Sequence, residues 1–120
     1  MEKTINVNGI PIPFKATGST TRRYRQKFGR DIFKDVGTLI QESNGGKTAL
    51  SIESLEIFEN LAYIMAQQAD PNVPEDPDEW LDQFEIFDIY HILPQLLELW
   101  NLNEKTLEEP KKKAGKQSDR

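Results

Sequence analysis

The sequence contains no cysteine and a single histidine, His91. Without cysteine there can be no disulfide, no thiolate metal site and no cysteine nucleophile. A histidine metal cluster or a Ser-His-Asp triad would have to be built around one imidazole in an apolar run, so we expect His91 to be a structural residue of the last helix. The sequence therefore predicts no catalytic residue, no metal and no cofactor.

Long apolar runs are also missing. No window approaches the roughly 18 apolar residues that a membrane span requires. Met1 to Thr4 lead straight into a strand-like pattern, without the basic and apolar stretches of an export signal. Of the 120 residues, 37% are hydrophobic and 29% are charged, which is typical of one globular domain. These features predict a cytoplasmic protein that does not bind membranes.

Lysine and arginine are absent between Thr48 and Glu104, although carboxylates recur throughout that stretch. The basic residues gather instead in residues 22–34 and 111–120, so the net charge of −5 hides a strong segregation of charge. Such electrical polarity can orient a molecule toward a partner or toward other copies of itself.

A β-hairpin is expected at residues 3–15. Apolar positions alternate with polar residues or prolines on both sides of Asn8-Gly9, the dipeptide best suited to the positive φ angles of a two-residue turn. Pro11 and Pro13 lack amide donors, so their strand must lie at an edge of its sheet.

Helices are expected over residues of about 20–102. Cap and stop signals divide this stretch into successive helices: Thr20 or Thr21 to Gly29, Asp31 onward, Ser51 to about Ala69, and Asp78 onward after a proline-rich linker. The apolar stripe of the Ser51 helix is wider than one packing surface requires, which predicts a helix buried on two sides, either in the middle of the domain or against another subunit. The apolar run from Phe84 to Leu102 also indicates helix, which Pro94 should kink or split.

The fold class that follows is α+β, mostly α, with an N-terminal hairpin, four to six helices and a disordered basic C-terminal tail. We place the domain at residues 1–103 and the tail at residues 104–120, where apolar residues nearly vanish. No internal repeat is evident.

Two apparent ligand motifs do not meet their own requirements. Gly45-Gly46-Lys47-Thr48 is similar to the end of a phosphate-binding loop, but the first glycine of that motif would fall at Gln41. The acidic stretch after Asp70 has the alternating oxygens of a calcium loop, but the required glycine and bidentate glutamate would fall at Glu75 and Leu81. Neither segment predicts a ligand site.

The segment Arg22-Arg23-Tyr24-Arg25 is the one feature that could bind nucleic acid, because arginines neutralise phosphates and an aromatic ring can stack on a base. Two observations favour a different interpretation. The rest of the domain carries a negative excess that would repel a polyanion, and helical spacing places Tyr24 and Phe28 on one core-facing side. We therefore favour a basic face that meets an acidic protein surface.

The run from Ile5 to Gly18 (INVNGIPIPFKATG) and the run from Arg23 to Ile32 (RYRQKFGRDI) resemble the tail assembly chaperones of siphophages, especially those of Gram-positive hosts. The likeness continues in general character through the helix from Leu55 to Ala69, Trp80-Leu81, and the segment from Leu96 to Trp100. It covers most of the expected domain, and its residues are ordinary ones rather than a catalytic signature.

The resemblance implies a factor that acts in the host cytoplasm and is absent from the mature virion. Such a chaperone keeps the aggregation-prone tape measure protein soluble until tail tube subunits polymerise around it. The resemblance also implies self-association, and a longer form made by a programmed frameshift whose added domain recruits tail tube protein. Lys111-Lys112-Lys113 is where an adenine-rich slippery site could lie.

The residues expected to contact partners are of two kinds, since an apolar client requires apolar surface and the basic segment supplies charge. The candidates are Arg22, Arg23, Arg25, Arg30, Phe58, Leu61, Met65, Trp80 and Trp100. The apolar members could equally fill a small core. Two other functions stay open: a small nucleic-acid-binding regulator that uses the Arg22–Lys34 segment, and a component of the head-tail connector.

Overall fold

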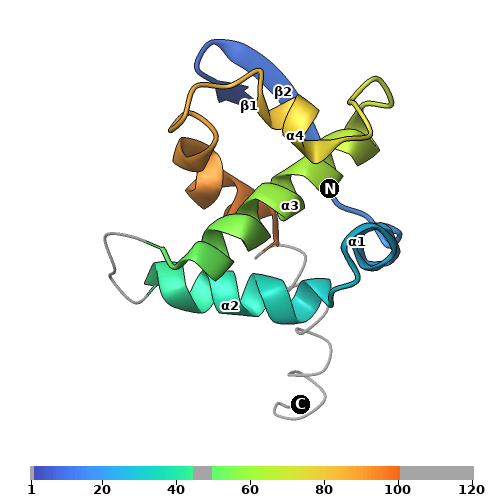
Figure 1. Cartoon of the computed structure of the whole chain (residues 1–120), viewed down its shortest axis with the longest axis vertical. Helices are drawn as coiled ribbons and strands as arrows, with labels where there is room; N and C mark the ends of the chain where they lie inside the picture. The colour runs from blue at the N-terminus through green and yellow to red at the C-terminus, as the bar shows by residue number, and fades with distance from the viewer. Residues whose placement is uncertain (1, 45–49, 101–120) are drawn as a thin grey trace, which may run out of the picture.

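In the computed structural model, which describes residues 2–44 and 50–100, an antiparallel hairpin precedes a series of helices (Figure 1). The elements are β1 (Glu2–Val7), β2 (Ile10–Lys15), α1 (Thr20–Phe28), α2 (Ile32–Asn44), α3 (Ile52–Ala69), α4 (Pro77–Leu81), the 3₁₀-helix η1 (Tyr90–Ile92) and a helix at residues 93–100. The predicted α+β class, mostly α, is confirmed. The predicted disordered tail lies outside the described residues.

The hairpin turns at Asn8-Gly9, where φ is 51° and 88°. These left-handed angles suit asparagine and glycine, and the Gly9 N–H donates to Asn6 Oδ1 at 2.6 Å. The two strands pair from Glu2 with Lys15 to Val7 with Ile10, and no third strand joins them in the described residues. The predicted hairpin and its proline-bearing edge strand are therefore confirmed.

The junctions around α1 follow the cap signals in part. Gly29 ends α1 with φ of 68°, and its N–H donates to the Arg25 carbonyl oxygen at 2.8 Å, as predicted. Neither Thr20 nor Thr21 is the cap, because α1 begins at Thr20 after Ser19, which makes no side-chain cap bond. The buried Thr20 hydroxyl instead accepts from the Thr17 N–H and donates to Gln68 of α3.

Helix α3 crosses the middle of the molecule and packs against β2, α1, α2 and α4 (Figure 1). Ser51 caps it by accepting a hydrogen bond from the Ser54 N–H at 3.1 Å. Nine of its residues are buried, among them every residue from Leu61 to Ala66. The prediction of a helix covered on two sides is confirmed, and the covering elements belong to the same domain.

The segment before the last helix differs from the prediction. Residues 82–89 form turns rather than helix, η1 follows, and helix resumes at residue 93. Pro94 stands in the first turn of that last helix, where a missing N–H costs no hydrogen bond, so it begins a helix instead of splitting one. Aromatic contacts hold the turns at both ends, with Phe84 against Trp80 and Tyr90 against Phe58.

Aromatic rings join the helices in the core. Edge contacts link Tyr24 to Phe28, Phe28 to Tyr63 and Tyr63 to Trp80, with ring centroids 5.1–6.4 Å apart. The Trp100 indole N–H donates to the Met65 sulfur at 3.1 Å, which ties the last helix to α3. None of the helices in the described part is both long and apolar enough to cross a bilayer.

Candidate protein-interaction site

The five apolar candidates for partner contact all lie in the core of the single chain. Their exposed fractions are 4% or less, and they come from α3, α4 and the last helix: Phe58, Leu61, Met65, Trp80 and Trp100. A partner cannot touch a side chain that its own chain encloses. These residues therefore support the fold of the chain, and the apolar surface that a partner could reach lies elsewhere.

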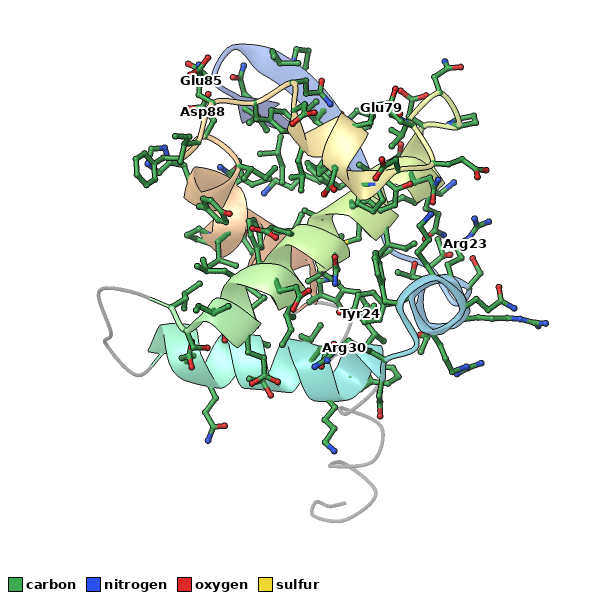
Figure 2. All side chains as sticks on the ribbon, viewed as in Figure 1. Arg23, Tyr24, Arg30, Glu79, Glu85 and Asp88 are labelled. Carbon is green, nitrogen blue, oxygen red and sulfur yellow. The ribbon has the colours of Figure 1, made fainter. Side chains whose placement is uncertain are left out.

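The most exposed pair of neighbouring apolar residues is in the turn segment that we call the apolar loop, Glu85–Asp88. Ile86 is 76% exposed and Phe87 is 69% exposed. An acidic residue flanks the pair on each side, and Figure 2 shows Glu85 and Asp88 beside the hairpin. Two large adjacent apolar side chains with a polar rim are a candidate contact site for another protein.

The apolar loop is fastened to the rest of the molecule on both sides. Asp88 accepts a hydrogen bond from the Asn8 side-chain amide at 2.9 Å, which joins the loop to the hairpin turn. Phe84 packs on Trp80 before the loop, and Ile89 is buried directly after it. Because its neighbours are anchored inward, the Ile86-Phe87 pair is held outward.

Three of the four arginine candidates form an exposed basic face on α1: Arg22, Arg23 and Arg25. Within the described residues none of them has a carboxylate at ion-pair distance, and Arg23 Nε donates to Ser19 Oγ at 3.2 Å. Tyr24, which lies between them in the sequence, is fully buried, as helical spacing predicted. The basic face is therefore free to meet an acidic surface.

Arg30 has a different environment. Its Nε and one terminal nitrogen donate to the two carboxylate oxygens of Asp35 at 2.7 and 2.9 Å, and the same terminal nitrogen lies 3.5 Å from Glu53. Asp35 is 5% exposed and also accepts from the Tyr24 hydroxyl at 2.8 Å. Arg30 thus belongs to a structural network that joins α1 to α2, apart from the basic face.

The network shifts the ionisation of its members. Burial acts to raise the pKa of Asp35, but hydrogen bonds from Arg30 and Tyr24 and the charge of Arg30 outweigh burial and lower it. The hydrogen bond and charge of Asp35 raise the pKa of Arg30. Burial, with the hydrogen bond to Asp35, raises the pKa of Tyr24 far above its usual value. At neutral pH the network is a charged pair with a neutral phenol.

Comparisons with known protein families, curated proteins and solved structures found no match.

Within the described residues no group of three or more His, Asp and Glu side chains could hold a metal ion. His91 is exposed on η1 rather than within the last helix, so its predicted structural role there is wrong. The candidate sites in this part of the chain are therefore two exposed surfaces, the apolar loop and the basic face of α1.

Sequence reasoning missed the apolar loop because its residues were assigned to a helix. Ile86 and Phe87 add bulk to an apolar run, and a run alone does not show which side chains face inward. The available signal was the pair of acids that bracket them, since Glu85 and Asp88 are costly to bury.

Proposed function

We propose that the protein is a non-catalytic tail assembly chaperone of a long-tailed bacteriophage, which binds and solubilises the tape measure protein in the host cytoplasm. The observation that carries this proposal is the exposed Ile86-Phe87 pair, held outward beside the hairpin turn. The sequence resemblance is a separate support for the proposal. Its strongest part lies in β1, β2 and α1, which follow one another directly along the chain.

The energetics suit a client with a long apolar helix face. Burying one large apolar side chain contributes about 1.5–3 kcal/mol, so one copy would hold the client weakly. Many copies side by side along a repetitive client would bind through their combined contacts. This is the reason to expect self-association and a high copy number for each client.

The remaining parts of the proposal concern the assembly process. The protein acts before the tail is complete and is absent from the mature virion. A longer, frameshifted form recruits tail tube protein to the coated client. The Lys111–Lys113 codons, where frameshifting is proposed, encode residues outside the described part of the chain.

A second candidate is a small nucleic-acid-binding regulator, and the observation in its favour is the basic face of α1, which has no ion pair within residues 2–44 and 50–100. Against it, the surface from Asp70 to Asp88 is strongly acidic and would repel a polyanion. Oligonucleotide binding measured at several salt concentrations separates the two candidates, because only the regulator would bind with an affinity that falls steeply as salt rises.

The apolar loop is tested with paired surface variants. The double variant Ile86→Ser/Phe87→Ser removes the exposed pair, and Ile52→Ser is the matched control because Ile52 is 85% exposed on α3. Each form is co-expressed with the tape measure protein of the same gene neighbourhood. The wild type and the control should keep the client soluble and co-purify with it, and the double variant should not. Equal recovery of soluble client with all three forms would refute the role of the loop.

A further inference from the structure

The hairpin has one strand edge whose backbone groups have no partner among the described residues. Val7 and Ile10 flank the two-residue turn and form a bonded pair, so bonded pairs recur at every second position along the ladder. The N–H and C=O groups of Glu2, Thr4 and Asn6 therefore point away from β2. In the described part of the chain no other backbone group bonds to them, and no third strand joins the sheet.

The opposite edge of the hairpin, on β2, is closed to a further strand. Pro11 and Pro13 occupy its outward positions, and proline has no N–H to donate. The β1 edge has no proline, its register has no bulge, and its outward residues Glu2, Thr4 and Asn6 are exposed. Figure 1 shows the hairpin at one end of the molecule, away from α2. An added strand can therefore pair only with β1.

The β1 edge is complementary to itself in the antiparallel direction. When two β1 strands meet with Thr4 opposite Thr4, the outward backbone groups of each strand face those of the other, and Glu2 of each copy faces Asn6 of the other. No like charges face each other, because Lys3 lies opposite Ile5 and is paired with Glu98 of its own chain at 3.2 Å. Threonine pairs of this kind stabilise antiparallel strands.

The side chains at the two ends of the edge favour a second copy as the partner. Asn6 Oδ1 accepts from the Gly9 N–H at 2.6 Å, which leaves the amide N–H groups of Asn6 to donate outward. The Glu2 carboxylate has no ion pair within the described residues. A carboxylate that accepts from an amide forms a strong hydrogen bond, and a two-fold axis makes this pair twice.

We propose that two copies of this chain pair through β1, antiparallel and with Thr4 at the two-fold axis. The result is a four-stranded sheet in the order β2-β1-β1-β2. Both of its outer edges are the proline-bearing β2 strands, so the sheet stops at two copies. The proposed function expects self-association but names no contact surface. This contact requires no client, so its test and the test of the chaperone function can fail independently.

Single cysteines in the full chain locate the contact, because the sequence contains no other cysteine. Opposite residues of a bonded pair have Cα atoms about 5.5 Å apart, which a disulfide can span. On oxidation, Thr4→Cys should form a disulfide-linked dimer about tenfold faster than Gln41→Cys, an exposed control on α2. Glu2→Cys and Asn6→Cys should each be slow alone and fast when mixed. Thr4→Cys no faster than the control, or Glu2→Cys as fast alone as in the mixture, would overturn the proposal.

Two substitutions at the centre of the edge test whether backbone pairing holds the dimer. Thr4→Pro removes an N–H that bonds nothing within the described chain, and Thr4→Val is the matched control that keeps it. In light-scattering chromatography without client, the wild type and Thr4→Val should have twice the mass of one chain. Thr4→Pro, shown to be folded by circular dichroism, should have the mass of one. A wild type of single mass, or a folded Thr4→Pro that stays dimeric, would overturn the proposal, and the cysteine pairs decide it if Thr4→Pro does not fold.

Discussion

Asp35 connects two helices through three hydrogen bonds, two from Arg30 and one from Tyr24. Replacing it with asparagine keeps the size but removes the charge that both partners depend on. We expect Asp35→Asn to lower the free energy of unfolding by about 2 kcal/mol, the usual scale for hydrogen bonds to a charged group. Urea denaturation measures the change, and a loss below about 0.5 kcal/mol would show that the network is not a structural element.

The same carboxylate gives stability an acid limit. Its folded pKa is lowered, so its contribution is fully present above the ordinary pKa of an unfolded aspartate, about 3.9, and is lost as pH falls through the lower folded value. We expect the free energy of unfolding to decrease below about pH 4 by more in the wild type than in Asp35→Asn. Parallel pH profiles for the two proteins would contradict this assignment.

Individual residues also show where sequence reasoning stops. Arg30 was grouped with Arg22, Arg23 and Arg25 because all four share one basic segment. The sequence gives no sign that Asp35, five positions later, folds back onto Arg30 across the Gly29 turn. Tyr24 was correctly placed in the core, because its spacing with Phe28 is visible in the sequence.

At the scale of elements, two glycines with opposite requirements test the local structure. Gly9 has φ of 88° in the hairpin turn, which strains any side chain, whereas Gly37 lies within α2 with open space around it and no such angle. We expect Gly9→Ala to destabilise the protein by about 1–2 kcal/mol. Gly37→Ala should stabilise it by about 0.5–1 kcal/mol, because alanine has the higher helix propensity.

Thermal and urea unfolding of the two variants check this pair, and each serves as the control of the other. If both substitutions changed the free energy of unfolding by the same amount, the backbone conformation at the two glycines would not be the cause of the change. A destabilised Gly37→Ala would mean that α2 has less space at this position than the structure gives it.

Elements with local signals were predictable from the sequence. The Asn8-Gly9 turn, the Gly29 stop and the Ser51 cap each depend on residues within a few positions of one another. The 82–92 segment was not predictable, because ring contacts from Trp80 and Phe58 hold its ends and these partners lie on other elements. The outward direction of Ile86 and Phe87 follows from that packing.

At the scale of the whole molecule, charge segregation predicts how partners are attracted. The basic face of α1 and the acidic residues of Asp70–Asp88 carry opposite charge on one small domain. We expect the complex with the client to weaken as salt rises, and Arg22→Gln/Arg23→Gln/Arg25→Gln to reduce that dependence. Affinity measured over a salt series checks this, and identical salt slopes for the two proteins would contradict it.

The proposed function depends most directly on whether this chain keeps its client in solution. The decisive measurement is co-expression with the tape measure protein, followed by light-scattering chromatography of the purified material. The account predicts a soluble complex with many copies of this chain for each client molecule. A client that stays insoluble while this chain elutes alone would contradict it, and binding of an oligonucleotide by the α1 basic face would then be the function to test.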